Sequence, residues 1–343
     1  QIVAIRMADR IGKGIRTAPR DALVASSVDE SIRGKSFGFH RAMDHTGAVI
    51  GPILAIVSIL LIFNLTDIKE PLVALRWTFI AAIIPGILAI LTIILFVKES
   101  GTSVKNNNSF FLSLKVLDPN FRNYLLIVIL FTLGNSSDAF LLFRVEESIK
   151  ASGAVTDFVM RNSFLNGIVS GFTDPETRED IINILFLPLV WAFFHIIKVI
   201  FSTPLGALSD RIGRKKVINI GWGIYAFVYF SFALIVFLPS GLQIIATFFL
   251  FAIYALFYAF TEGAERAFVA DLISNENRGA AYGIFNFAVG VGTLPASIIF
   301  GIIYSSFNDI IPGYGGSIAF SFGGTLALIS MLLLAFKVKE PAR

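Results

Sequence analysis

Long apolar stretches separated by short polar turns run along almost the whole chain. A membrane-spanning helix needs roughly 20 mostly apolar residues. The segments that reach this length cover residues 2–28, 36–63, 72–97, 121–143, 181–208, 217–238, 242–272, 280–306 and 314–338. The pattern predicts an all-α, polytopic membrane protein with about nine transmembrane helices, of which the first is heavily charged.

Two longer polar stretches divide this series of helices. Residues 98–118 are rich in Asn and Ser, and we expect a cytoplasmic linker there. Residues 144–180 are polar and of mixed charge, which predicts an external loop. The expected organisation is therefore one group of helices in residues 1–97 and a second group in residues 119–343.

Two segments that lie 245 residues apart carry the same small and basic residues at the same spacing. Ala22, Val24, Ala25, Arg33, Gly34, Gly38 and Gly47 recur as Ala267, Val269, Ala270, Arg278, Gly279, Gly283 and Gly292. The spans that begin near 121, 181 and 217 have no counterpart upstream. We therefore expect two related six-helix halves, with the first three helices of the first half absent from this sequence. The alternative is a genuine nine-helix protein.

Composition excludes several classes of protein. The chain is 55% hydrophobic and only 15% charged, whereas about a quarter of the residues in a soluble domain are charged. It has no cysteine, which excludes disulfides and thiolate chemistry, and its three histidines are too scattered to predict a metal site. We expect no cofactor and no nucleic-acid partner, and no nucleophile–base arrangement suggests an enzyme.

The distribution of Lys and Arg predicts the topology. Basic residues gather in the short loops at one side of the predicted helices, and most of those on the other side fall in the long stretch 144–180. Short loops rich in Lys and Arg face the cytoplasm. We therefore expect a multi-pass protein of the inner (plasma) membrane with a cytoplasmic C-terminus. We also expect it to be a monomer in the lipid bilayer.

Three motifs carry a family resemblance. Residues 206–216, GALSDRIGRKK, resemble the loop signature G-x-x-x-D-R-x-G-R-[RK] of the major facilitator superfamily. Residues 7–18 resemble its fourth-helix pattern in part, since Arg10 matches but Lys13 and Arg16 depart from it. Gly47, Gly51 and Pro52 resemble a fifth-helix pattern of antiporters without its trailing glycines. The resemblance implies two six-helix bundles that rock around a midplane site.

The loop motif also has a physical reading of its own. Gly206 and Gly213 permit close approach and a sharp turn, and Asp210 can meet a positive helix N-terminus. Arg211 and Arg214 can fork onto a carboxylate of a neighbouring helix. The candidate carboxylate is Asp271, at the end of segment 242–272. The result would be a cytoplasmic gate, and the alternative is a topological anchor without a gating role.

Charges inside membrane helices are costly and usually functional. Near the middle of the first helix, Arg10, Lys13 and Arg16 are candidates for contact with substrate or protons. Near its end, we expect Arg20 to pair with Glu265 and Asp21 to pair with Arg266, because the repeat places charges of opposite sign at these equivalent positions. The first reading of these four residues is a gate rather than a substrate site.

Polar side chains on four other segments complete the candidate site. Asp44 follows His40 by one helical turn, which suits a proton relay or a solvated helix entrance. Segment 181–208 carries a polar stripe that includes His195 and Lys198. The remaining candidates for substrate or proton binding are Asp138, Tyr258 and Glu262.

These observations predict a secondary active transporter that moves a small organic solute by alternating access. No nucleotide-binding loop is present, so we expect coupling to an ion gradient, with protons carried by Asp44, Asp138, Glu262 or Glu265. The antiporter-like glycines suggest export. Excess positive charge on the first helix favours an anionic solute, and the abundance of Phe and Tyr favours an amphipathic drug. The alternative function is a membrane receptor or regulator that keeps the fold without transport.

Overall fold

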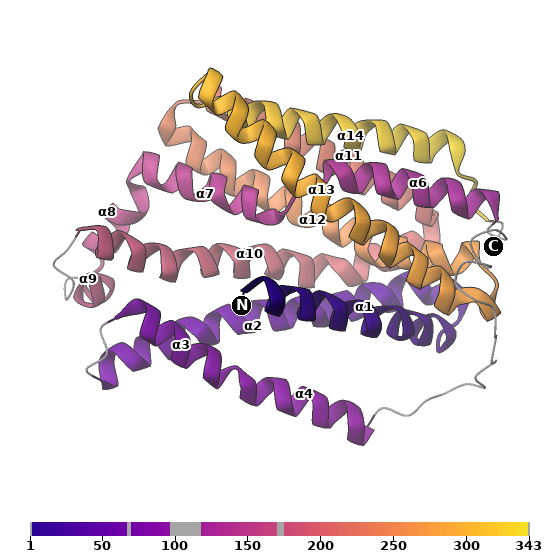
Figure 1. The fold of residues 1–343 in the computed structure, drawn as a ribbon, viewed down its shortest axis with the longest axis horizontal. Coiled ribbons are helices and arrows are strands. Elements are labelled where there is room, and N and C mark those ends of the chain that lie inside the picture. The colour runs from indigo at the N-terminus through magenta and orange to yellow at the C-terminus, as the bar shows by residue number, and fades with distance from the viewer. Residues whose placement is uncertain (1, 67–69, 97–117, 170–174, 342–343) are drawn as a thin grey trace.

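The computed structural model describes residues 2–66, 70–96, 118–169 and 175–341 (Figure 1), and the structural statements below refer to these residues. The first half contains α1 (Ile2–Ser26), η1 (Glu30–Ile32), α2 (Arg33–Leu65), α3 (Pro71–Ala81) and α4 (Ile83–Phe96). The second half contains α6 (Pro119–Gly134), α7 (Asp138–Ser152), α8 (Ala154–Arg161), α9 (Ser163–Val169), α10 (Pro175–Ile212), α11 (Arg214–Leu234), η2 (Ile235–Phe237), α12 (Ser240–Leu272), η3 (Asn275–Asn277), α13 (Arg278–Ile310) and α14 (Gly315–Lys337).

The predicted all-α membrane architecture is confirmed. Eight helical stretches of the described chain are long and apolar enough to cross a membrane. They are Glu30–Leu65, Leu72–Phe96, Pro119–Ile149, Phe186–Ile212, Arg214–Phe237, Leu242–Leu272, Asn275–Ile310 and Gly315–Lys337. Segment 2–28, the remaining predicted span, does form a helix, α1, but its many charges keep it out of this set.

The sequence repeat reappears as a repeat of secondary structure. The short helices η1 and η3 and the long helices α2 and α13 are separated by the same 245 residues at both ends. Before η1, the Asp29 carboxylate accepts hydrogen bonds from the Ser31 N–H at 2.9 Å and the Ser31 hydroxyl at 2.7 Å. These bonds hold the pKa of the exposed Asp29 below its usual value. Ser274 occupies the equivalent position before η3.

Small residues let the two halves approach closely. Helix α2 of the first half lies along α10 of the second (Figure 1). A Cβ atom on Gly38 would lie 3.1 Å from the Ser202 carbonyl carbon, and one on Gly206 would lie 3.2 Å from the Gly38 Cα. A Cβ on Gly263 of α12 would lie 2.9 Å from the Gly38 nitrogen. Backbone atoms fill these positions, so larger side chains would force the helices apart.

The predicted span 121–143 is interrupted. Helix α6 ends at Gly134 and α7 begins at Asp138. The Tyr225 hydroxyl donates to the Gly134 carbonyl oxygen at 2.9 Å, which satisfies an acceptor that the break would leave open. Ser137 caps the start of α7 by accepting a hydrogen bond from the Ala139 N–H at 3.3 Å. The break therefore places the Asp138 carboxylate at a helix N-terminus inside the bundle.

The stretch 144–180, which we expected to be a loop, is largely helical where it is described. Helix α7 continues to Ser152 and stops at Gly153, whose φ of 63° suits a glycine at a helix end. Helices α8 and α9 follow, and α10 begins at Pro175. The mixture of charges in this stretch therefore lies mainly on helices in the part that the structure describes. Of the predicted linker 98–118, only Asp118 lies within the described residues.

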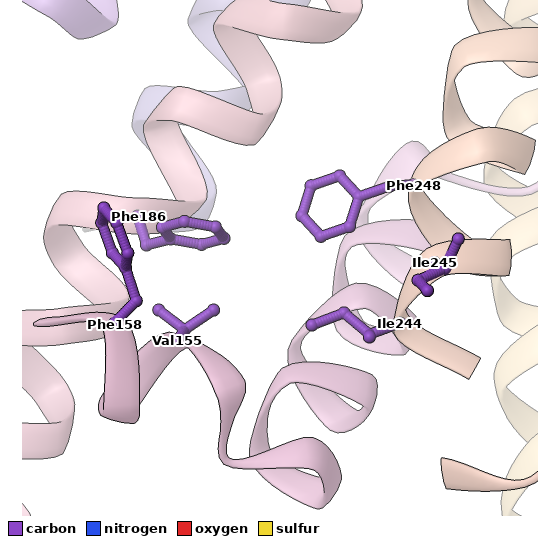
Figure 2. Close-up of a pocket in the computed structure, with 6 residues that line it drawn as sticks. All are labelled: Val155, Phe158, Phe186, Ile244, Ile245 and Phe248. Carbon is purple, nitrogen blue, oxygen red and sulfur yellow. The ribbon is translucent and has the colours of Figure 1, made fainter. Parts of the chain in front are cut away.

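An apolar pocket of about 460 Å³ lies between α8, α10 and α12 (Figure 2). Its lining residues are Val155, Phe158, Phe186, Ile244, Ile245 and Phe248. All six side chains are apolar, so nothing among them could orient a charged solute. The candidate site is therefore sought among the buried polar side chains.

Candidate functional site

A buried charged cluster joins the two halves. Glu262 of α12 lies at its centre: its Oε2 is 2.7 Å from Nε2 of His45 on α2, and its Oε1 is 3.4 Å from Nζ of Lys198 on α10. The second histidine, His195 of α10, places Nδ1 3.1 Å from Nδ1 of His45. The side chains of His45 and Lys198 are 8% and 4% exposed. We call these four residues the central cluster.

Aromatic rings pack against two members of the central cluster, Lys198 and His195. The Lys198 ammonium lies 3.8 Å from the centre of the Tyr258 ring and 5.0 Å from that of Phe194. The Trp191 ring meets the His195 ring edge-on at 4.8 Å. A cation between an aromatic face and a carboxylate is well stabilised without water. The predicted polar stripe of α10 therefore points into the protein.

Asp138 forms a second polar group beside the central cluster. Its Oδ1 accepts hydrogen bonds from the Tyr254 hydroxyl at 2.6 Å and the Tyr258 hydroxyl at 2.9 Å. Tyr258 therefore touches both the Asp138 carboxylate and, through its ring, the Lys198 ammonium. The break between α6 and α7 makes this contact possible, because it brings the start of α7 against α12.

A third group lies on α1 and α2. Asp44 is 42% exposed and lies 3.1 Å from Nη1 of Arg41, 3.7 Å from Nδ1 of His40 and 3.9 Å from Nη1 of Arg20. Nε and Nη2 of Arg41 are buried and have no hydrogen-bond partner within the described chain. Guanidinium N–H groups left in this way are unusual in folded proteins. The exposure of Asp44 favours the solvated reading of the His40–Asp44 pair over a buried relay.

One of the two predicted ion pairs between the halves is present, and the other is not. Asp21, which is 1% exposed, accepts a hydrogen bond from Nε of Arg266 at 2.9 Å, as expected. Arg20 does not reach Glu265 and instead binds Asp21 at 3.0 Å. Glu265 accepts a hydrogen bond from Nε1 of Trp222 at 3.0 Å. The buried Asp21 carboxylate accepts hydrogen bonds from the guanidinium groups of both Arg20 and Arg266. The Glu265 carboxylate, which we expected to bind Arg20, binds the indole N–H of Trp222 instead.

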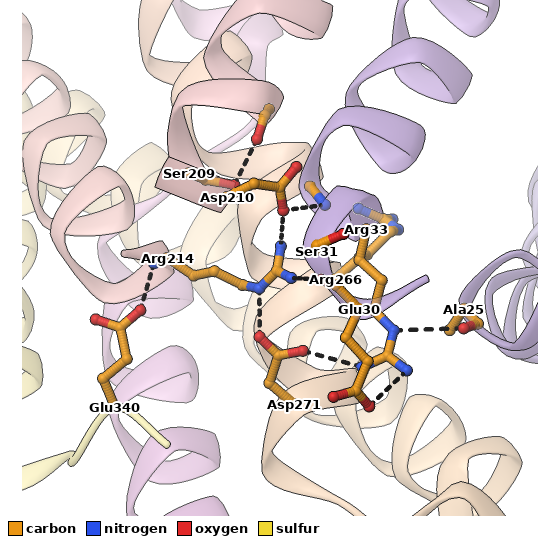
Figure 3. Close-up of polar contacts among 12 residues, drawn as sticks. Ala25, Glu30, Ser31, Arg33, Ser209, Asp210, Arg214, Arg266, Asp271 and Glu340 are labelled. Atoms are coloured by element: carbon orange, nitrogen blue, oxygen red, sulfur yellow. Dashed lines mark hydrogen bonds and ion pairs between the residues drawn. The ribbon is translucent and has the colours of Figure 1, made fainter. Parts of the chain in front are cut away.

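The loop motif forms a network at one end of the bundle, which we call the latch (Figure 3). Arg214 donates from Nη1 to Asp210 at 2.8 Å and from Nε to Asp271, so the predicted Arg214–Asp271 contact is present. Asp210 also accepts hydrogen bonds from the backbone N–H groups of Gly34 and Lys35, each at 2.8 Å. It therefore meets the N-terminus of α2, as its position in the motif predicted.

Arginine 33 completes the latch across the two halves. Its Nη1 lies 3.1 Å from Oδ1 of Asp271, and its Nη2 lies 3.0 Å from Glu30. Its repeat equivalent, Arg278, also approaches Glu30, at 3.7 Å. Both arginines donate to the carbonyl oxygen of Ala25, at 3.4 and 3.5 Å. The arginines of the repeat therefore converge on one point between the halves.

The other glycine and arginine of the motif have different surroundings. Gly213 has φ of 107°, a conformation that side chains rarely adopt, and the Glu340 carboxylate occupies the place where a Cβ would point. The same carboxylate accepts a hydrogen bond from the Arg214 backbone N–H. Arg211 is exposed and takes part in no ion pair of the described residues, so the expected second fork onto Asp271 is wrong.

Of the three candidates near the middle of the first helix, the structure describes the side chain of Arg16. Arg16 is exposed, and the side chains of Arg10 and Lys13 lie outside the described part of the structure. The residues that sequence reasoning missed include His45, Arg33 and Arg41. His45 follows Arg41 by one helical turn, so the sequence did show that polar residues continue along this face of the helix. Nothing in the sequence indicated that Glu262 is the partner of His45.

The described residues hold no group of three or more side chains suited to a metal ion. The candidate site is held by ion pairs and hydrogen bonds, three of which join Asp21, Arg33 and His45 of the first half to the second half.

Comparison with known proteins identifies the family. The family model described as Major Facilitator Superfamily matches residues 1–173 and 162–343. The chain belongs to the Major Facilitator Superfamily. Like the superfamily's other members, it is a multi-pass membrane protein and a transporter rather than an enzyme.

The similar proteins differ in how much they share with the chain. An uncharacterized MFS-type transporter of Methanocaldococcus jannaschii is 34% identical over 96% of this chain and 70% of its own length. Multidrug resistance protein 2 of Bacillus subtilis is 30% identical over 43% of the chain and 34% of its own length. The structure of a double-tryptophan mutant of XylE matches 94% of the chain and 67% of its own, with a TM-score of 0.57 and 18% identity. This last likeness supports the fold alone.

Proposed function

We propose that this transporter is a secondary active transporter that couples movement of a small organic solute to protons. The observation that carries the proposal is the central cluster, in which Glu262 binds a histidine of the other half at 2.7 Å and a lysine of its own half at 3.4 Å. A proton that binds Glu262 neutralises a carboxylate that faces both a lysine of its own half and a histidine of the other half, so its protonation state alters contacts in both halves. Because the contact crosses the halves, its strength depends on their relative position.

In this proposal the latch is the cytoplasmic gate, and the described state is closed on that side. Cross-half contacts occur at two levels, with Arg33–Asp271 in the latch and Asp21–Arg266 nearer the central cluster. The glycines of α2 and α10 bring the backbones together between them. Opening toward the cytoplasm must break these contacts, which is a rocking motion of one half against the other.

The proposed solute carries an oxyanion. Of the two classes that the sequence left open, the anionic one is favoured by Arg41, whose Nε and Nη2 have no partner in the described chain. These two N–H groups form one edge of the guanidinium group, which suits two oxygens of a carboxylate, sulfonate or phosphate. An anion on this edge would satisfy two buried donors that the protein leaves open.

The proposed direction is export in exchange for protons. Gly47 and Gly51 have no atom of the described residues within 4 Å of a Cβ placed on them. Close helix packing therefore gives no account of these glycines in this state, which leaves the antiporter resemblance as their reading. The partial similarity to a protein named for multidrug resistance supports the same direction.

Vesicles that contain the purified full-length protein would test the proposal. The matched probes are benzenesulfonate, benzenesulfonamide and phenyltrimethylammonium, whose charges do not follow pH, so an imposed pH gradient acts on the protein alone. We expect movement of benzenesulfonate against its gradient, and loss of that movement in Glu262→Gln. Absence of pH-driven movement for all three probes would contradict the proposal. Selective movement of the cation would contradict the oxyanion.

A further inference from the structure

The two histidines of the central cluster form a continuous hydrogen-bonded path that ends on a carboxylate. Nδ1 of His195 lies 3.1 Å from Nδ1 of His45, and Nε2 of His45 lies 2.7 Å from Oε2 of Glu262. The far end of the path, Nε2 of His195, is buried and has no hydrogen-bond partner in the described chain. A buried ring nitrogen in this position is an open end of the path.

Counting protons restricts how this path can be occupied. A neutral imidazole has one N–H and one acceptor nitrogen. When Glu262 is ionised, His45 must donate from Nε2 to the carboxylate, so its Nδ1 is an acceptor. His195 must then donate from its own Nδ1, which leaves its Nε2 as a bare acceptor. The ionised state of Glu262 therefore prepares His195 Nε2 to receive a proton.

One added proton reverses every bond in the path. A proton binds Nε2 of His195, and the proton on its Nδ1 passes to Nδ1 of His45. The proton on Nε2 of His45 then passes to Oε2 of Glu262. Both rings end neutral with exchanged tautomers, and Glu262 ends as a neutral carboxylic acid that donates to His45. Three protons are then present where two were before, so the balance is one proton taken up.

We propose that His195 and His45 form a proton relay whose entrance is Nε2 of His195 and whose end is Glu262. The proposal rests on the proposed function in one respect, since protons are the coupling ion there. It adds a defined route, two residues that carry the proton, and a change of tautomer that accompanies each proton.

The charged and titratable groups around the path are compatible with this route. Lys198 faces Glu262 from α10, and Tyr258 of α12 covers the Lys198 ammonium. Asp138 of α7 and Arg41 of α2 also act electrostatically on Lys198, and Asp138 favours its positive charge whereas Arg41 opposes it. Lys198 supplies the positive charge next to the carboxylate, so a second lasting cation on either histidine would be unfavourable. A relay through neutral rings avoids that charge.

The relay also links the proton to the position of the halves. His45 belongs to α2 of the first half, whereas His195 and Glu262 belong to the second. In the ionised state the bond between His45 and Glu262 has a charged acceptor, and in the protonated state both partners are neutral. Hydrogen bonds to a charged group are roughly twice as strong as neutral ones. Uptake of a proton therefore weakens a contact that holds the halves together.

Nitrogen-15 magnetic resonance of the full-length protein in lipid bilayers would test the relay directly. The chain has three histidines, so histidine labelling gives few signals, and His40→Gln removes the one outside the path. As the pH is lowered, we expect His45 to change from the Nε2–H to the Nδ1–H form and His195 to change in the opposite sense, with no doubly protonated ring. In Glu262→Gln both forms should stay fixed. A doubly protonated ring, or a tautomer change that persists in Glu262→Gln, would overturn the proposal.

Transport measurements separate the relay from the proposed function. We expect His195→Gln and His45→Gln to lose pH-driven movement of benzenesulfonate at least about tenfold while they keep exchange of the solute across the membrane, and we expect His40→Gln to behave as the parent. Full pH-driven movement in His195→Gln would overturn the relay and leave proton coupling intact. If the parent shows no pH-driven movement, the proposed function fails, and the magnetic resonance result alone decides whether the path carries a proton.

Discussion

Replacing Asp271 by Asn should weaken the closed state of the latch without disturbing either half. Asp271 accepts from Arg214, which belongs to its own half, and from Arg33, which belongs to the other. Asn keeps the size of the side chain and one acceptor oxygen but removes the charge. The interaction within the second half is retained in every state, so the difference between states comes from Arg33.

The size of the effect follows from that one contact. Arg33 and Asp271 are 4% and 11% exposed and lie 3.1 Å apart, so solvent screens the pair little. A hydrogen bond to a charged group contributes about 1.5–3 kcal/mol. Asn would keep part of this, so we expect a shift of about 1.5 kcal/mol toward the open state. A shift of 1.4 kcal/mol is tenfold in an equilibrium constant, so the open fraction should rise roughly tenfold.

Alkylation of an introduced cysteine would measure this fraction. The chain has no cysteine, and Ser202, which is 2% exposed, lies where α10 meets α2. A membrane-impermeant maleimide applied from the latch side should modify Ser202→Cys about ten times faster when Asp271→Asn is also present. Arg211→Gln is the matched control, because it removes an exposed charge from the same loop and should leave the rate unchanged. Equal rates for the Asp271→Asn and parent proteins would refute the reasoning.

Three further outcomes are expected. Gly38→Val should reduce transport to below about a tenth of the parent rate, because its Cβ would meet the Ser202 backbone and overpacking of this kind costs about 1–3 kcal/mol. Gly86→Ala is the control and should be neutral, because no atom of the described residues lies within 4 Å of the added Cβ. Equal flux from both variants would contradict this reasoning. Trp222→Phe should lower the thermal unfolding temperature of the protein in detergent, because it removes the indole N–H that donates to the buried Glu265 carboxylate. Loss of such a donor costs about 1–3 kcal/mol. An unchanged unfolding temperature would contradict this reason. Arg41→Lys should raise KM for benzenesulfonate about tenfold, since Lys keeps the charge but lacks the two neighbouring N–H groups of the guanidinium edge. An unchanged KM would exclude the Nε–Nη2 edge of Arg41 as the anion site.

The repeat allowed much of the fold to be predicted from sequence. Membrane-spanning helices can be predicted from the length and hydropathy of apolar segments. The fixed offset between the two copies of the repeat also predicted that their helices begin and end at equivalent residues. The same offset identified the Asp21–Arg266 pair, because equivalent positions of two related halves meet at their interface. The loop motif identified the Arg214–Asp271 contact, because both residues lie at the same end of neighbouring helices.

What the sequence could not provide is which side chain completes each buried pair. The Glu265 carboxylate binds the indole of Trp222 rather than Arg20, and no spacing along the chain relates α11 to α12 at that level. His45 was not among the predicted site residues, yet it lies beside Glu262, since the glycines bring α2 against the second half. The break at Gly134 was missed although four polar residues, 135–138, follow this glycine, because the apolar stretches on either side together have the length of one span. The Gly134 carbonyl that the break leaves open is satisfied by a distant tyrosine.

The central claim is that Glu262 couples movement of the solute to movement of protons. Measuring proton movement driven by a solute gradient tests this claim most directly. A pH-sensitive dye enclosed in vesicles with the full-length protein would report protons after a gradient of benzenesulfonate is imposed without any initial pH difference. We predict that the parent protein moves protons in response, and that Glu262→Gln exchanges the solute but moves no protons. Proton movement by Glu262→Gln at the parent rate would contradict the account.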